Sequence, residues 1–339
     1  MFECCPVETL LEIKNTFNVK PKSQGSNCKI IACRELHDFL TTFFRYSKVP
    51  KIHPPLTNEV KGWYNDNIDL KRSIIIPCLQ SDGYHQSRNQ GYSEVGLVGN
   101  SRILHHYFVD AMYYEYGMLP SSYYCDFAES HITYYKNKSM KGINDDVFDL
   151  GKSAKTSPAH GQSIEEYLMQ PQPHLDYLLD ASETEQQIAL RIWASTEGSI
   201  SVTRKDGYVY PRLRIGCAHP DLVKQLQQIA RRLKINFIIS KSRCNWSGIQ
   251  GLYNVSLSSC LQFLKFGGFI KGVKISSKSK YHEGIDKDVL FLGILEYKKC
   301  ELENNHLKKL PMQQVHHEIN KIVENRKYKS VDYYINYFS

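Results

Sequence analysis

The sequence lacks the patterns that define several common classes of protein. Its ten cysteines include no Cys-x-x-Cys pair, and no second ligand pair follows Cys28 and Cys33 at a spacing that suits zinc. Its thirteen histidines form no His-Glu-x-x-His pattern, and no P-loop or Gly-x-Gly-x-x-Gly follows a predicted strand. The sequence therefore argues against a zinc finger, a zinc protease and a nucleotide-binding fold.

Long apolar runs are also missing. No uncharged apolar stretch reaches the roughly 18 residues that a membrane span needs, and no charged-then-apolar signal opens the chain. Cys78, Cys217 and Cys260 lie among apolar residues and are expected to be reduced. We expect no membrane contact and an intracellular, reducing compartment, either cytoplasm or organelle matrix. Without a terminal His-Asn pair, an intron-encoded or free-standing origin is favoured over an intein.

What the sequence does have is length and positive charge. Its 339 residues suffice for two or three domains or for two fused repeats, and a hydrophobic content of 42% allows a large core. The net charge of +8 makes a polyanionic partner plausible. The competing explanation for that charge is solubility alone.

Two short stretches carry most of the information: Leu79-Gln80-Ser81-Asp82-Gly83 and Ala194-Ser195-Thr196-Glu197-Gly198. Each ends an apolar, helix-like run with an acid followed by glycine, and each precedes a strand-like segment. The two acids are separated by about the length of a small domain. A repeated helix that ends in one carboxylate can place two carboxylates side by side.

The segments after the two motifs repeat in the same order. After Gly83, a predicted hairpin is followed by a helix that Ser101 caps and by further strand-like alternation at 130–136. After Gly198, a hairpin with a turn at Asp206-Gly207 is followed by a helix that opens at Pro220 and by two more strands. This ordered repetition is stronger evidence than either motif.

The chain is therefore divided into four parts. We expect an N-terminal extension over 1–60, a first repeat over 61–180, a second repeat over 181–300 and a helical tail over 301–339. Residues 28–40 resemble residues 253–264 in pattern, which suggests that the extension is the remnant of a repeat end. Two unrelated strand–helix junctions explain the same pattern equally well.

These residues resemble the LAGLIDADG homing endonuclease family in its two-repeat, single-chain form. The closest match is Leu190–Ile200, and Ile75–Tyr84 has the same pattern in the first half. The resemblance spans roughly 60–300. It implies an α+β fold of two pseudo-symmetric αββαββα repeats, in which the two motif helices pack together and antiparallel sheets form a saddle that binds DNA.

The resemblance also implies a catalytic site. Asp82 and Glu197 would bind a divalent metal, normally Mg²⁺, which activates water against the phosphodiester. The structural alternative is that each acid caps a nearby backbone amide. Gln80 and Ser195 are expected to cap or orient. A basic residue often assists in the family, and the candidates are Lys271 and Lys274 in the second repeat and Lys152 and Lys155 in the first.

Two departures from the family pattern concern the helix crossing. The family usually has a small residue four positions before Ser81 and Thr196, where this chain has Pro77 and Ile192. Proline within a helix removes a hydrogen bond and costs roughly 3 kcal/mol unless it is accommodated. If the helices were pushed apart, the two acids would separate and metal sharing would fail.

DNA contacts are expected from the polar faces of the predicted strands. Polar and apolar residues alternate there, so the polar set would face DNA while the apolar set packs beneath. The alternative is an ordinary solvated sheet face. The candidates are His85, Ser87, Arg88, His131, Thr133, Lys136, Ser199, Ser201, Thr203, Arg204, Lys205, Arg212, Arg214, Lys241, Arg243 and Asn245.

The sequence thus predicts a site-specific endonuclease that cuts double-stranded DNA as a monomer with internal pseudo-twofold symmetry. The first alternative is a relative of the same fold that binds DNA or intron RNA without cleavage, such as a splicing maturase or a regulator. The second is an interaction protein with fortuitous motifs.

Overall fold

The computed structural model describes residues 2–3, 22–23, 28–30, 57–88, 92–99, 101–125, 130–137, 154, 156–276 and 278–339. The chain forms two compact units: Met1–Pro54 with Asp126–Ala128, and Pro55–Cys125 with Glu129–Ser339. In the first unit, β1 (Phe2–Glu3), β3 (Cys28–Ile30) and β2 (Lys22–Ser23) form an antiparallel sheet in that order. The rest of the segment that resembles 253–264, residues 31–40, lies outside the described residues.

The first repeat begins with helical segments that lead to the first motif. Thr57 caps α3, and Ser101 caps α5 through its hydroxyl, which accepts a hydrogen bond from the Leu104 amide. Gly117 ends α5 in the left-handed conformation at φ 62°. The elements are α3 (Asn58–Asn65), the π-helix η1 (Lys71–Ile75), α4 (Ile76–Ser81), β4 (Gly83–Arg88), β5 (Tyr92–Gly99), α5 (Arg102–Tyr116), β6 (Ser121–Cys125) and β7 (Ser130–Asn137).

The second repeat follows two short helices in the connecting segment, α7 (Ile164–Leu168) and α8 (Asp176–Leu179). Ser182 and Glu185 form a capping box at the start of the second motif helix, α9, which fixes where that helix begins. The elements are α9 (Glu183–Thr196), β8 (Gly198–Lys205), β9 (Tyr208–Gly216), α10 (Pro220–Arg232), β10 (Ile238–Lys241), β11 (Ile249–Asn254) and α11 (Leu257–Lys265).

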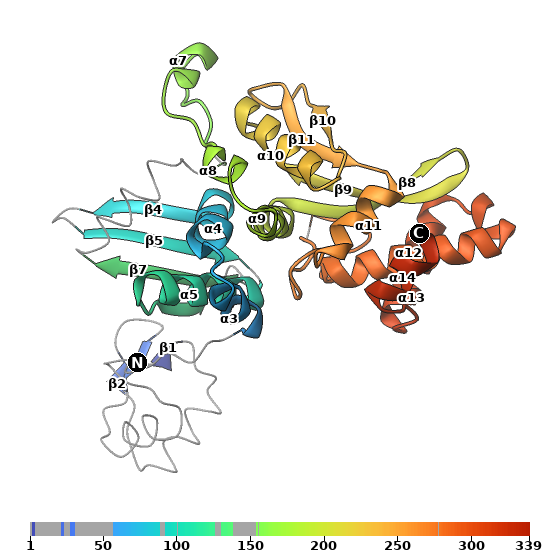
Figure 1. Ribbon diagram of the computed structural model, residues 1–339, viewed down its shortest axis with the longest axis horizontal. Helices are drawn as coiled ribbons and strands as arrows, with labels where there is room; N and C mark the ends of the chain where they lie inside the picture. The colour runs from blue at the N-terminus through green and yellow to red at the C-terminus, as the bar shows by residue number, and fades with distance from the viewer. Residues whose placement is uncertain are drawn as a thin grey trace, which may run out of the picture. The chain divides into compact units, whose positions relative to one another are not determined.

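The two repeats build sheets of the same topology. The first sheet has the order β4-β5-β7-β6 and the second has the order β8-β9-β11-β10, with antiparallel pairing between all neighbours. Helix α5 packs on β5 and β7, as α10 packs on β10 and β11 (Figure 1). The predicted α+β fold of two related repeats is confirmed. The last helix expected in the first repeat lies outside the described residues.

The two motif helices form the centre of the second unit. Helices α4 and α9 pack against each other, and η1 also packs on α9 (Figure 1). Trp193, Ile192 and Ile76 are fully buried there. Full burial of a large apolar side chain contributes about 1.5–3 kcal/mol, so this interface is a major part of the core.

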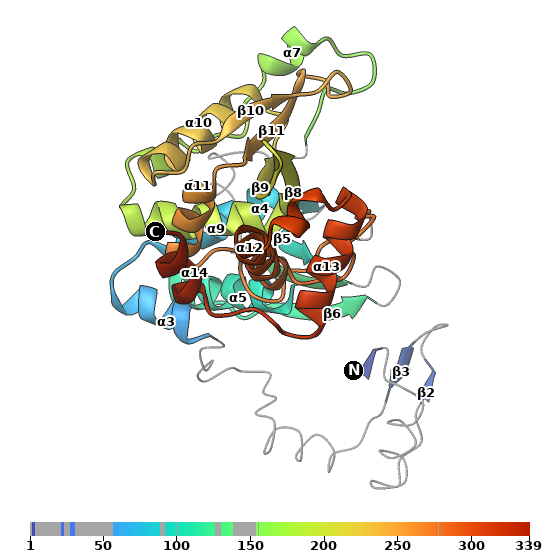
Figure 2. The same ribbon diagram turned by 90° about the vertical axis from the view of Figure 1, so that its right-hand side faces the viewer.

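The C-terminal segment folds into a helical layer that packs on the second repeat. It comprises α12 (Lys287–Glu303), the 3₁₀-helix η3 (Asn305–Lys309), α13 (Met312–Glu324) and α14 (Val331–Phe338), which lie together in Figure 2. Helix α13 docks through its apolar side, because Val315 and Ile319 are fully buried. Gly293 allows α12 and α13 to approach closely, since a Cβ there would lie 2.6 Å from Val323.

No helix in the described part of the chain is both long enough and apolar enough to span a membrane.

Candidate active site

Each motif helix ends at its acid. Asp82 follows α4 with φ −98°, and Glu197 follows α9 with φ −90°. The carbonyl of Asp82 accepts a hydrogen bond from the Val98 amide at 3.2 Å, and the carbonyl of Glu197 accepts one from the Gly216 amide at 2.9 Å. The second strand of each sheet therefore holds the acid of its own repeat in the same way.

The glycine after each acid is required by a close backbone approach. A Cβ on Gly83 would lie 2.3 Å from the Cα of Leu79, and a Cβ on Gly198 would lie 2.2 Å from the carbonyl oxygen of Ala194. Moving either backbone atom would distort the end of the helix. Only glycine therefore lets the strand follow the helix in so tight a turn. The acid–glycine pair thus has a geometric cause in both repeats.

The residues before the acids also behave alike. The hydroxyl of Ser81 donates to the Pro77 carbonyl at 2.7 Å, and that of Thr196 donates to the Ile192 carbonyl at 2.9 Å. Hydroxyls that bond four residues back satisfy themselves within the helix and bend it slightly. Neither hydroxyl is therefore left without a hydrogen bond where the two motif helices meet.

A π-turn accommodates Pro77. Residues Lys71–Ile75 form the π-helix η1, and the amide of Ile76 donates to the carbonyl of Lys71, five residues back. Pro77 has no amide hydrogen and cannot donate a helical hydrogen bond. The switch from π-helical to α-helical hydrogen bonding therefore falls at a position that lacks a donor in either helix type. Helices α4 and α9 remain packed together despite Pro77 and Ile192.

Gln80 and Ser195, two residues before each acid, anchor other segments. The amide of Gln80 donates to the His174 carbonyl at 2.9 Å, and its oxygen accepts from the Tyr177 hydroxyl at 3.0 Å. The hydroxyl of Ser195 accepts from the Ile270 amide at 2.8 Å. Both side chains hold neighbouring segments of the protein in place, as the sequence suggested.

Lys287, which the sequence did not single out, lies at the motif helices. Its ammonium donates to the carbonyls of Ser195 and Gly198, each at 2.6 Å, and only 5% of the residue is exposed. Burial lowers the pKa of Lys287 to about 8, while the charges of Asp82 and Glu197 oppose that decrease. The two acids therefore lie near enough to influence one buried cation.

The lysines predicted to assist have other positions. Lys271 and Lys274 are exposed, and the backbone of Lys274 pairs with that of Asp286, directly before Lys287. Lys152 and Lys155 lie outside the described residues. No local pattern marks Lys287, because its contacts join residues about ninety positions apart.

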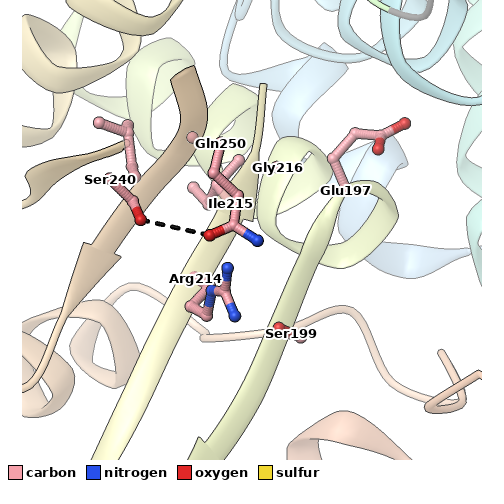
Figure 3. Close-up of a pocket in the computed structure, with 9 residues that line it drawn as sticks. Glu197, Ser199, Arg214, Ile215, Gly216, Ser240 and Gln250 are labelled. Atoms are coloured by element: carbon pink, nitrogen blue, oxygen red, sulfur yellow. Dashed lines mark hydrogen bonds between the residues drawn. The ribbon is translucent and has the colours of Figure 1, made fainter. Parts of the chain in front are cut away.

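A hollow opens on the sheet beside Glu197 (Figure 3). The guanidinium of Arg214 and the amide of Gln250 converge in it, and Glu197 lies at its edge. Gly251, at φ 136°, forms part of the lining, where a Cβ would lie 2.1 Å from the Ile215 carbonyl oxygen. The lining residues are Glu197, Ser199, Arg214, Ile215, Gly216, Ser240, Gln250, Gly251 and Leu252.

The hairpin β8–β9 has the alternation that the sequence suggested. Leu213 and Ile215 are buried, whereas Arg212 and Arg214 alternate with them and are partly exposed. The guanidinium of Arg212 lies over the ring of Tyr253, 5.2 Å from its centroid. Burial, and then the neighbouring charge of Arg212, lower the pKa of Arg214. Two guanidinium groups thus lie close together on this face.

The cross-strand register adds hydroxyl groups to the same face. Ser199 pairs with Arg214, and Ser201 pairs with Arg212. Thr203, two residues further along, pairs with Tyr210. Directly paired residues lie on the same side of a sheet, so serine, threonine and arginine share one surface.

The structure corrects the prediction that Arg204 contacts DNA. It pairs with fully buried Val209, and its guanidinium donates to the Leu310 carbonyl at 2.7 Å, which ties the sheet to the C-terminal segment. Adjacent strand residues point to opposite faces, so Arg204 cannot share a face with exposed Lys205. Arg204 is therefore a structural residue.

Three further candidates lie at the end of β10 and in the loop that follows it. Lys241 ends β10 and Arg243 lies in the loop, and both are exposed. Asn245 is not free to contact a ligand in the same way, because its amide donates to the Ile249 carbonyl at 2.6 Å and shapes the loop.

In the first repeat, the structure also corrects the prediction that Thr133 contacts DNA. It pairs with buried Leu97, is itself only 2% exposed, and its hydroxyl lies 2.7 Å from Nδ1 of His105. The strand register therefore turns Thr133 toward the core. The other first-repeat candidates have described backbone in β4 and β7, but their side chains lie outside the described part: His85, Ser87, Arg88, His131 and Lys136.

The donors at the two helix ends fit a hard divalent ion. Asp82 and Glu197 supply carboxylate oxygens, which Mg²⁺ prefers. In the described part of the chain, no group of three or more His, Cys, Asp or Glu residues could hold a metal ion. An ion between these two acids would therefore complete its coordination with water and with oxygens of a substrate, such as phosphate.

No protein-family profile matches the chain, and no curated protein matches it. Solved structures do. Meganuclease I-SmaMI bound to uncleavable DNA is 9% identical, with 75% of this chain and 98% of that chain covered and a TM-score of 0.43. A mesophilic variant of the homing endonuclease I-DmoI is 14% identical, with 59% and 89% covered and a TM-score of 0.39.

The N-terminal LAGLIDADG domain of WhiA is 12% identical, with 68% of this chain and 96% of that chain covered and a TM-score of 0.37. The likeness to these LAGLIDADG proteins is one of fold.

Proposed function

We propose that the chain is a LAGLIDADG-type, site-specific endonuclease that cuts both strands of DNA with a divalent metal. The observation that carries the proposal is the paired ending of α4 and α9. There, two acids held in equivalent ways influence one buried lysine, and each is followed directly by the first strand of a sheet. A single chain supplies both acids, so it acts as a monomer.

Each part of the site has a role in this proposal. Asp82 and Glu197 hold Mg²⁺ or another divalent ion, which supplies activation of water and stabilisation of the leaving oxygen when bound. Lys287 offsets the charge of the acids and, through the carbonyls of Ser195 and Gly198, keeps the end of α9 in place.

The exposed sheet faces hold the DNA duplex. Arginine side chains grip phosphate and read guanine, and hydroxyl groups contact phosphate or base edges. The net charge of +8 supports this partner. In the second repeat the residues assigned to this surface are Ser199, Ser201, Thr203, Lys205, Arg212, Arg214, Lys241 and Arg243.

The same fold also supports a relative that binds DNA or intron RNA without cleavage. The observation favouring this alternative is Lys287, whose buried positive charge acts on Asp82 and Glu197. A cation attached to the chain repels a divalent ion from these acids.

A selection of binding sites from a randomised duplex pool in Ca²⁺, followed by addition of Mg²⁺, tests the proposal. We expect an enriched sequence that is cut in Mg²⁺. Asp82→Asn and Glu197→Gln should bind it and not cut it, whereas Asp221→Asn, which alters an exposed acid on α10, should do both. Tight binding without cleavage by the unaltered protein would decide for the non-cleaving relative, and no enrichment would contradict both functions.

A further inference from the structure

The two sheets can be compared residue by residue, because their hairpins have the same register. Gly83 pairs with Leu97 in the first repeat, as Gly198 pairs with Ile215 in the second. Counting from these glycines, Tyr84 corresponds to Ser199. On the opposite strand, Gly96 corresponds to Arg214 and Glu94 corresponds to Arg212.

In the second repeat this surface is cationic. Arg214 lines the hollow beside Glu197, and Arg212 stacks on Tyr253. The Nε of Arg212 is buried and has no hydrogen-bond partner among the described residues. A buried guanidinium nitrogen and two adjacent positive charges call for a ligand rich in acceptors.

In the first repeat the equivalent surface is closed, and it carries the carboxylate of Glu94, which pairs across the sheet with Lys136. The Tyr84 ring lies across Gly96, where a Cβ would lie 2.6 Å from the ring. The Tyr84 hydroxyl donates to the Glu94 carboxylate at 3.0 Å, and Glu94 is only 7% exposed. An aromatic ring and a carboxylate thus take the places of a serine and two arginines.

The neighbouring strand of each sheet shows that the difference between the two repeats is local. Tyr134 pairs with Gly96, as Tyr253 pairs with Arg214, so both sheets keep a tyrosine at the next strand. The buried partners, Leu97 and Ile215, are also alike. The two repeats therefore share their framework and differ in chemistry at the positions nearest the acids.

We propose that Arg212 and Arg214 determine guanine on one side of the cleavage centre and that Tyr84 and Glu94 reject it on the other. This inference rests on the proposed binding of DNA. Arginine pairs bidentately with the acceptors of guanine, whereas a carboxylate repels those acceptors and the adjacent phosphates. The target is then asymmetric at mirror-related positions near its centre.

The test is the base preference of the full-length protein selected in Ca²⁺ from a randomised duplex pool. We expect guanine at one or two positions on one side of the centre and not at the mirror positions. Arg214→Gln should lose guanine at one of those positions and weaken binding of the selected duplex by about 5- to 150-fold. Arg212→Gln provides a second variant, and Arg231→Gln, an exposed arginine on α10, should keep both preference and affinity.

Two results would overturn the inference. Guanine on both sides, or a preference that survives Arg214→Gln and Arg212→Gln in folded protein, would show that these arginines do not set the asymmetry. Failure to enrich any sequence would overturn the proposed DNA binding and this inference with it.

Discussion

At the scale of single residues, the site depends on groups that have no room to change. A Cβ on Gly83 or Gly198 would collide with the backbone of the preceding helix, and the buried Lys287 ammonium bonds two carbonyls at once.

Replacing Gly198 by alanine tests this rigidity. The new Cβ meets a backbone carbonyl at 2.2 Å, so the helix–strand junction must shift, and we expect a loss of about 1–3 kcal/mol in the free energy of unfolding. Gly62 in α3 is the matched control, because a Cβ there meets nothing within 4 Å. Gly62→Ala should raise stability by roughly 0.5–1 kcal/mol. Denaturant unfolding measures both, and equal effects would contradict the assigned contact.

At the proposed metal site, the charge of Lys287 should make metal binding depend on pH. With its pKa lowered to about 8, Lys287 loses its proton as pH rises from 7 to 9. Losing that positive charge removes a competitor for the carboxylates, so we expect Ca²⁺ to bind up to about tenfold more tightly at pH 9 than at pH 7. Calorimetric titration of the protein at both pH values provides the measurement.

The control for this effect is a neutral replacement. Lys287→Met should bind Ca²⁺ with little change between pH 7 and pH 9, whereas Lys274→Met should retain the full dependence. A dependence that persists in Lys287→Met would assign it to another group.

At the scale of elements, a histidine pair links the loop before α12 to α13. Asn320 donates to the Tyr281 carbonyl at 2.7 Å, so its oxygen faces Nδ1 of His282, also at 2.7 Å. His282 then accepts at Nε2 from Nδ1 of His316, 2.8 Å away. This chain of bonds assigns the proton of His282 to Nδ1, requires the His282 ring to be neutral and makes Nδ1 of His316 a donor.

Acid should therefore weaken the fold. Burial, with the neighbouring His282, lowers the pKa of His316 to about 4, and burial also lowers the pKa values of His282 and His219. Unfolded histidine takes up protons below about pH 6.5, so stability falls as pH drops from about 6.5 toward 4.

We expect His316 alone to account for about 1 kcal/mol between pH 7.5 and pH 5, after allowance for its partial exposure. Thermal unfolding at the two pH values measures the loss. His316→Phe keeps the ring that stacks on Tyr281 and should reduce the loss without abolishing it, because His219 remains. An unchanged loss in this variant would contradict the role of His316.

Element order could be predicted from sequence because it depends on local signals such as hydrophobic periodicity, caps and turn residues. Side-chain direction depends on register, which explains the errors at Arg204 and Thr133: one residue along a strand reverses the face. Lys287 could not be found from sequence because its partners come from a helix about ninety positions away. Asp82 and Glu197 could, since the acid–glycine junction is a local constraint.

At the scale of the whole molecule, the described hydrophobic core begins at Val60 and continues through both repeats into Tyr334 of α14. The second unit is thus built from residues that follow Pro54 and include the C-terminal helices. The three-stranded sheet of the first unit has its own pairing.

A variant that begins at Pro55 is therefore expected to fold. Its thermal unfolding should remain cooperative, with a midpoint within about 5 °C of that of the full chain, because its core is intact. Ending the chain after Glu303 should lower the midpoint far more, since Val315, Ile319 and Tyr334 are fully buried. Calorimetry compares the two, and loss of cooperativity on removing residues 1–54 would contradict the expectation.

The buried ammonium of Lys287 also bears on what happens when metal is withdrawn. If only a bound metal ion neutralised the two acids, adding a chelator would leave their charges to repel each other and would separate the ends of the two helices. Here a cation that cannot diffuse away remains bonded to the end of α9. Under the proposed function, chelation should therefore stop cleavage while leaving DNA binding intact, so that the protein stays assembled on its target until metal is restored.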